Sequence, residues 1–144
     1  PWSAGLHPYF QVPWRKDLTL DDHLLNVRAK KTFQYQLDGT LVDNPKSNYP
    51  VPLGDEKLIN RVHYQLESPD AEISLLNGEE TIRISEASWR GKGSRLSFVS
   101  WTKPNQPYYC IEPWMSPPNA SENKTMEFVS PGAREEFTIE IELA

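Results

Sequence analysis

The sequence has little cysteine, little positive charge and no long apolar run. Its 144 residues include one cysteine, Cys110, and carry a formal net charge of -5. A single cysteine excludes an internal disulfide framework and fits a reducing, cytoplasmic compartment. The acidic excess argues against nucleic acid as a partner, because binding it requires clustered cations. No window approaches the roughly 20 apolar residues of a membrane span, so we expect no membrane partner.

Helical periodicity is also scarce, whereas β patterns recur along the chain. Asn77-Gly78 predicts a tight hairpin, Ser68-Pro69-Asp70 predicts another turn, and residues 38–55 predict one long loop. Only residues 19–23 resemble a helical turn. The sequence therefore predicts an all-β, antiparallel β-sandwich, with residues 1–144 as a single domain or a half-domain. The expected strands cover 24–31, 32–37, 61–66, 71–76, 80–85, 95–101, 108–111, 125–129 and 136–143.

One carboxylate stands inside an aromatic and apolar run. The run is Tyr108-Tyr109-Cys110-Ile111-Glu112-Pro113-Trp114, and Pro117-Pro118-Asn119-Ala120 follows it. Because proline has no N–H to donate, we expect the strand to end at Glu112, at a junction of the kind that often carries catalytic groups. Partial burial would raise the pKa of Glu112 and make it a better proton acceptor. The alternative is a rim carboxylate beside a basic neighbour.

A second concentrated motif is Leu6-His7-Pro8-Tyr9-Phe10. The proline pushes His7 toward an extended backbone, and the aromatic neighbours can hold an imidazole that titrates near neutral pH. A lone histidine is more often structural than catalytic. His7 therefore gains weight only in combination with Glu112.

The two motifs, in this order, resemble the aldose 1-epimerase (galactose mutarotase) family, including its hexose-6-phosphate epimerase relatives. The strand 98–102 before the Glu112 motif and Ser130-Pro131-Gly132 before the last strand also follow the order of the family. The chain resembles the C-terminal half of a member. The resemblance implies a mutarotase-type sandwich and an isomerase that interconverts the α and β anomers of a sugar or sugar phosphate, with no metal and no cofactor.

By the same resemblance, Glu112 is the general base at the anomeric hydroxyl and His7 is the acid at the ring oxygen. A positioned acid or base typically contributes 10²–10⁴ in rate. Asn60 stands where the family commonly has an Asp that binds sugar hydroxyls, and an amide can still donate and accept hydrogen bonds. Trp101 and Trp114 offer flat surfaces for a sugar, although tryptophan in a sandwich is more often core.

Family members are considerably longer, and their first half supplies a further active-site His and usually an Arg. Three interpretations follow: an isomerase with part of its site, a non-catalytic carbohydrate-binding or sugar-sensing sandwich, and a structural β-domain. The chain opens directly on Pro1 and Trp2, which is how a fragment begins. Half a sandwich would expose an apolar face or an unpaired edge, so we expect pairing with the missing N-terminal half or self-association.

Overall fold

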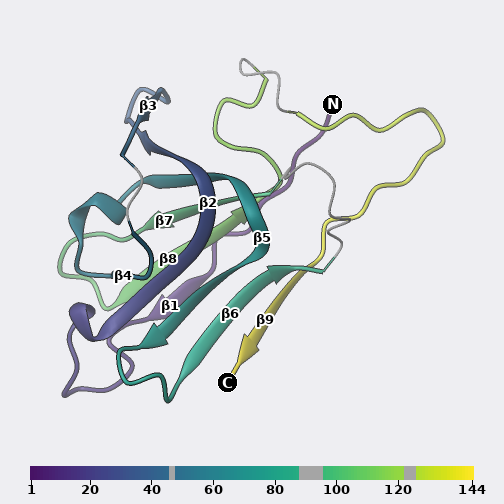
Figure 1. Cartoon of the computed structure of the whole chain (residues 1–144). Helices are drawn as coiled ribbons and strands as arrows, with labels where there is room; N and C mark the ends of the chain where they lie inside the picture. Colours follow the sequence, from purple (N-terminus) through teal and green to yellow (C-terminus); the bar gives the residue numbers. More distant parts are fainter. Residues whose placement is uncertain (46–47, 88–95, 122–125) are drawn as a thin grey trace.

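The chain forms a curled antiparallel sheet (Figure 1), which confirms the predicted all-β class. The computed structural model describes residues 1–45, 48–87, 96–121 and 126–144. Within these ranges the main hydrogen-bonded path runs β1, β8, β7, β5, β2, β3. Two short 3-10 turns, η1 (Leu20–Asp22) and η2 (Glu56–Leu58), accompany the strands. The strands are β1 (Tyr9–Gln11), β2 (His23–Tyr35), β3 (Leu41–Asp43), β4 (Val51–Pro52), β5 (Arg61–Leu75), β6 (Thr81–Glu86), β7 (Ser97–Trp101), β8 (Tyr108–Trp114) and β9 (Ile139–Leu143).

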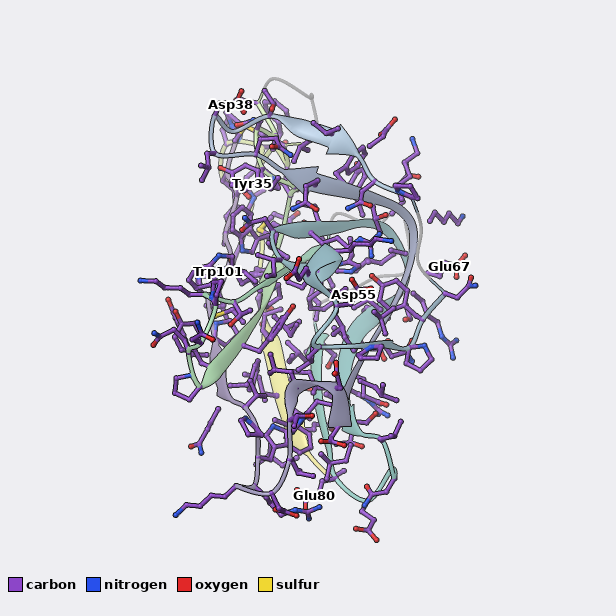
Figure 2. All side chains as sticks on the ribbon, turned by 90° about the vertical axis from the view of Figure 1, so that its left-hand side faces the viewer. Tyr35, Asp38, Asp55, Glu67, Glu80 and Trp101 are labelled. Atoms are coloured by element: carbon purple, nitrogen blue, oxygen red, sulfur yellow. The ribbon has the colours of Figure 1, made fainter. Side chains whose placement is uncertain are left out.

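The two longest strands, β2 and β5, pair with each other along most of their length (Figure 1). The prediction of a turn at Ser68-Pro69-Asp70 is wrong, because these residues lie within the single curved strand β5 (Figure 1). Instead, the register with β2 shifts between Val27 and Ala29, since a proline has no N–H for the ladder. The turn signal marks a bulge, where Glu67 points away from the sheet (Figure 2).

Other turn signals are confirmed. Asn77-Gly78 lies in the β5–β6 hairpin, where Gly78 has a φ of 74° and donates its N–H to Leu75 O at 2.8 Å. The helical turn expected at 19–23 is η1, and the expected 38–55 loop contains the short strands β3 and β4. No helix among the described residues has the length and apolar character needed to cross a membrane.

Strand β8 passes through Pro113, so the prediction that it stops before this proline is wrong. The Pro113 carbonyl accepts the Leu6 N–H at 3.0 Å, on the side of β8 away from β7. In a strand, the N–H and C=O of one residue point to the same side, so the missing donor leaves the β7 ladder intact. The N–H of Met115 donates to Ala4 O at 2.8 Å. The N-terminal segment is thereby held along β8 beyond the end of β1.

The two faces of β8 have different surroundings. Tyr109 and Ile111 point into the apolar core, where burial of one large aliphatic side chain is worth about 1.5–3 kcal/mol. Cys110 and Glu112 alternate with them and point to the opposite face. That face carries the candidate site. Core residues from the neighbouring strands include Leu25, Val27, Ile73, Ile84 and Phe98.

Strand β9 is an edge strand with apolar side chains in solvent. The alternation of the sequence predicted that Phe137, Ile139, Ile141 and Leu143 all face inward. Phe137 and Ile139 do pack against the core. Ile141 and Leu143 are 47% and 80% exposed, so the prediction is wrong for these two residues.

Candidate active site

His7 and Glu112 meet on the face of β8 opposite the core. His7 Nε2 lies 3.2 Å from Glu112 Oε1. The Glu112 side chain is only 4% exposed, whereas that of His7 is 47% exposed. The register of β1 with β8 pairs Tyr9 with Cys110, and its continuation by two residues sets His7 beside Glu112. Two motifs far apart in the sequence thus bring an imidazole and a carboxylate into direct contact.

Trp114 fixes the orientation of the carboxylate. Its indole Nε1–H donates to Glu112 Oε2 at 3.1 Å. The indole itself lies against Gly5, where an added Cβ would stand only 3.0 Å from Trp114 Cδ1. The two oxygens of Glu112 therefore have separate partners: Oε2 accepts from Trp114, and Oε1 faces His7.

Burial governs the protonation of the acidic groups here. Desolvation raises the pKa of Glu112 above its ordinary value, and the charge of His7 and the Trp114 hydrogen bond act in the opposite direction. A raised pKa makes a carboxylate a better proton acceptor near neutral pH. Burial, with the nearby charge of Glu112, raises the pKa of Cys110 to about 12. The thiol is therefore protonated at neutral pH and is a poor nucleophile there.

Aromatic rings surround His7. Tyr9 stacks on the imidazole with 4.9 Å between ring centroids and 18° between planes, and Trp101 meets the imidazole edge-on at 5.7 Å. The Tyr108 ring contacts the rings of Tyr9 and Trp101, with centroid distances of 5.0 Å and 5.9 Å. Trp101 is half-buried and lies at the side of the molecule (Figure 2), so it is not a core residue.

Sequence reasoning placed Trp101 and Trp114 in the site and expected the aromatic neighbours of His7, Tyr9 among them, to hold the imidazole, but it missed Tyr108. A signal for Tyr108 was present, since strand alternation puts residues 108, 110 and 112 on one face. The contact of Tyr9 with Tyr108 had no local signal, because it depends on the pairing of β1 with β8.

Asn60 lies at the same end of the sheet but apart from the acid–base pair. The register Arg61 with Ser100 places Asn60 level with Trp101. Two strand spacings, about 10 Å, separate it from β8. Its backbone has a φ of 56°, a left-handed conformation that asparagine tolerates well. The structure therefore brings together four of the five predicted site residues and leaves Asn60 at the margin.

A shallow pocket of about 330 Å³ opens beside the pair. Its size is at the lower end of small-molecule sites. Because His7 forms part of its wall, a ligand in this pocket would reach the imidazole. The lining residues are Ser3, Ala4, Gly5, Leu6, His7 and Trp114.

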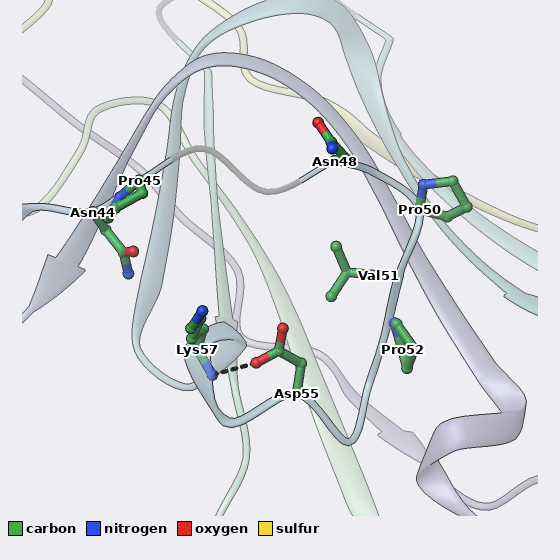
Figure 3. A pocket seen from close by; sticks show the side chains of 8 residues that line it. All are labelled: Asn44, Pro45, Asn48, Pro50, Val51, Pro52, Asp55 and Lys57. Atoms are coloured by element: carbon green, nitrogen blue, oxygen red, sulfur yellow. Dashed lines mark hydrogen bonds between the residues drawn. The ribbon is translucent and has the colours of Figure 1, made fainter.

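A second pocket, of about 410 Å³, has no comparable chemistry (Figure 3). The Asp55 carboxylate accepts the Lys57 N–H at 2.9 Å and caps η2. The Asn44 amide accepts from Arg61 at 3.2 Å and donates to Gln34 at 3.0 Å. These polar groups serve the local structure, and the described lining residues include no histidine. They are Asn44, Pro45, Asn48, Pro50, Val51, Pro52, Asp55 and Lys57.

Comparison with solved structures finds proteins of similar fold. The Slr1438 protein of Synechocystis sp. PCC 6803 is similar with a TM-score of 0.68 and 22% identity, over 99% of this chain and 45% of that chain. A candidate aldose 1-epimerase of Escherichia coli K12 is similar with a TM-score of 0.68 and 15% identity, over 100% of this chain and 50% of that one. The chain has the fold of part of such a protein.

A galactose mutarotase-related enzyme of Lactobacillus acidophilus is also similar, with a TM-score of 0.54 and 18% identity, over 80% of this chain and 40% of that one. The chain spans about half the length of the solved structures it matches. No protein-family model and no curated protein matches the sequence. The likeness to galactose mutarotase-like proteins is therefore a likeness of fold.

Proposed function

We propose that this chain binds an aldose or aldose phosphate and interconverts its α and β anomers, with Glu112 as general base and His7 as general acid. The observation that carries the proposal is the 3.2 Å contact between His7 Nε2 and Glu112 Oε1 beside an open pocket. The fold shared with a candidate aldose 1-epimerase supports the substrate class.

The proposed reaction is a ring opening followed by closure on the other face. The Glu112 carboxylate takes the proton of the anomeric hydroxyl, the C1–O5 bond breaks as the C1–O1 double bond forms, and protonated His7 gives its proton to O5. Rotation about the C1–C2 bond then presents the other face of the aldehyde to O5. Return of both protons closes the ring, so the pair is regenerated in each turnover.

The short distance within the pair suits this reaction. O1 and O5 are bonded to the same carbon, so the base and the acid must converge on two neighbouring oxygens. A sugar in the pocket would separate His7 from Glu112 and take up the hydrogen bonds that they now share. The Trp114 hydrogen bond keeps Glu112 Oε2 in place, so that Oε1 is the oxygen presented to the substrate.

The surrounding rings and Asn60 are proposed to hold the sugar. Tyr9, Trp101 and Trp114 border the pair, and their flat surfaces suit the C–H faces of a pyranose. Asn60 stands about 10 Å from β8 by strand spacing, within reach of the far hydroxyls of a hexose or its phosphate. Asn60→Asp, which keeps a residue tolerant of positive φ, tests whether a charge there strengthens binding.

The proposal extends to partners and location. The exposed apolar side chains of β9 favour association with a complementary half-sandwich or with a second copy of the chain. A cytoplasmic location rests on the single cysteine of the sequence.

The decisive experiment follows pure α-glucose, α-galactose and a hexose 6-phosphate to anomeric equilibrium by polarimetry. We expect the native chain to accelerate the approach for at least one sugar, and Glu112→Gln and His7→Gln each to lower the rate about 10²–10⁴-fold. Glu80→Gln is the matched control, because Glu80 is an exposed carboxylate at the far end of the molecule from Asp38 (Figure 2) and away from the pair. Equal rates for the native chain and Glu112→Gln would remove Glu112 as the base.

Binding is measured separately from turnover. Tryptophan fluorescence should shift saturably with the sugar, because Trp101 and Trp114 border the site. A saturable shift without any rate gain would favour the non-catalytic carbohydrate-binding module. The absence of both signals would favour a structural β-domain.

A further inference from the structure

We propose that His7, Cys110 and Glu112 form a binding site for a thiophilic divalent cation, above all Zn²⁺. In the metal-free protein His7 Nε2 faces Glu112 Oε1 at 3.2 Å, and the cation would sit between these two atoms and the Cys110 sulfur. Cys110 has no part in the proposed sugar chemistry. The site therefore gives this buried cysteine a function that the ring-opening reaction does not require.

The three donors already converge. His7 Nε2, Cys110 Sγ and a carboxylate oxygen of Glu112 all lie within 4.8 Å of one another. A tetrahedral Zn²⁺ with bonds of about 2.0–2.3 Å needs ligand atoms about 3.3–3.6 Å apart. The 3.2 Å separation of His7 Nε2 and Glu112 Oε1 is close to that spacing. The Cys110 sulfur would then have to approach the other two donors by up to about 1.2 Å to complete three ligands.

The convergence is fixed by the sheet. Cys110 and Glu112 are two residues apart on β8, so their side chains lie on one face. Tyr9, the strand partner of Cys110, holds the imidazole of His7 by stacking. The arrangement is therefore set by the strand geometry of β8 and by the stacking of His7 on Tyr9.

The donor set selects the type of cation. One sulfur, one imidazole nitrogen and one carboxylate oxygen suit Zn²⁺ and Co²⁺, whereas Mg²⁺ and Ca²⁺ prefer sites made of oxygen alone. Three protein ligands leave a fourth position for water. Here that position faces the pocket, since His7 lines it and is half exposed.

A second sphere of contacts supports the ligands. Trp114 donates to Glu112 Oε2, which leaves Oε1 directed at the site. Hydrogen bonds of this kind orient metal ligands and typically change metal affinity 10–100-fold when removed. On binding, the Cys110 thiol releases its proton to the buffer and coordinates as thiolate.

Occupancy has a functional consequence, and this part rests on the proposed anomer interconversion. An ion bonded to His7 Nε2 removes the lone pair that carries the acid proton, and an ion bonded to Glu112 Oε1 removes the base. The cation would therefore inhibit the reaction by occupying both groups at once. A cell could in this way couple sugar interconversion to free Zn²⁺.

The binding test uses Co²⁺ and then Zn²⁺ with the full chain, and it does not depend on activity. We expect one equivalent of Co²⁺ to give a thiolate-to-cobalt charge-transfer absorption, which Zn²⁺ displaces. Cys110→Ser should abolish this absorption and weaken Zn²⁺ binding by calorimetry tenfold or more. His7→Gln, at a half-exposed position that cannot disturb the core, should weaken binding similarly, whereas Glu80→Gln should leave it unchanged.

The inhibition test compares rates with and without Zn²⁺. Zn²⁺ should slow anomer interconversion in the native chain and leave Cys110→Ser at its metal-free rate. Zn²⁺ affinity that is equal in the native chain and in Cys110→Ser, or no Co²⁺ absorption at millimolar metal, would overturn the site. Binding without any loss of rate would overturn the inhibition alone. A chain that binds Zn²⁺ but never interconverts anomers would reject the proposed function and retain the metal site.

Discussion

Trp114 and Glu112, two residues apart on one face of β8, are joined side chain to side chain by a 3.1 Å hydrogen bond. The contact exists because β8 continues through the intervening proline in extended form. Had the strand ended there, the indole would have left this face. In the sequence, Pro113 and Trp114 resemble the end of a strand. In the structure they continue β8 and hold the Glu112 carboxylate in place.

Loss of this hydrogen bond should reduce turnover more than it reduces stability. Trp114→Phe keeps a large ring and removes only the N–H, so Glu112 can rotate and its pKa should rise further. We expect kcat to fall about tenfold or more, measured by polarimetry, given what a single hydrogen bond to a charged group is worth. Trp14→Phe is the matched control, because the buried Trp14 Nε1 has no acceptor among the described residues. Equal losses in the two variants would contradict the orienting role.

Protonation of His63 should weaken the fold as the pH falls. His63 is fully buried between two partners: its Nδ1 lies 3.1 Å from Phe98 O, and its Nε2 accepts the hydroxyl of Tyr49. Burial lowers the pKa of His63 to about 3. The unfolded chain takes up this proton near pH 6.5, so the stabilisation is complete above that pH and is lost as the pH falls toward 3.

The expected slope is about 1.4 kcal/mol per pH unit below pH 6, measured by urea unfolding between pH 7 and pH 5. His63→Gln should remove most of this slope. The raised pKa of Glu112 acts with the opposite sign, so both proteins are compared in a Glu112→Gln background. A slope that persists without His63 would assign the effect to another group.

The β5–β6 hairpin should require glycine at residue 78. Gly78 has a φ of 74°, and a Cβ added there would meet nothing within 4 Å. Gly78→Ala should therefore cost about 1–2 kcal/mol of unfolding free energy through backbone strain alone. Gly78→Asn should cost less than the alanine variant, because asparagine tolerates this conformation. Equal losses in urea unfolding would show that strain is not the cause.

The exposed edge at β9 should drive association. Leu143→Lys places a charge on the edge strand, where it opposes pairing with another strand. We expect a lower apparent mass in light scattering at high protein concentration, with unfolding free energy changed by less than about 0.5 kcal/mol. Leu37→Lys changes a leucine that is also highly exposed, at 105% against 80% for Leu143, but lies away from this edge, and it should have no such effect. A native chain that is monomeric throughout would contradict the prediction.

The sequence predicted much of the site because its chemistry is concentrated in two short motifs. The family resemblance carried by these two motifs, in their order, paired His7 with Glu112 before any contact was known. The sequence could not place Tyr9 against Tyr108, because that contact depends on pairing with a strand about a hundred residues away. Contacts of that kind leave no periodic pattern in either segment.

The wrong predictions about the fold have the same cause: each depends on contacts between segments far apart in the sequence. Proline at residues 69 and 113 predicted chain reversal and strand ending, yet both residues lie within strands. Whether a missing N–H matters depends on which side the partner strand lies, and local sequence does not contain that information. The exposure of Ile141 and Leu143 likewise depends on how far the core extends beneath β9.

His7, the acid of the proposed pair, lies just before the short edge strand β1. Strand β1 has three residues, and the segment before it is held by single main-chain hydrogen bonds such as Leu6 N–H to Pro113 O. Short edge segments open locally at free energies far below that of global unfolding. Local opening of β1 and the segment before it would separate His7 from Glu112 while the core stayed folded. The chemistry of the protein should therefore fail on heating before its fold does.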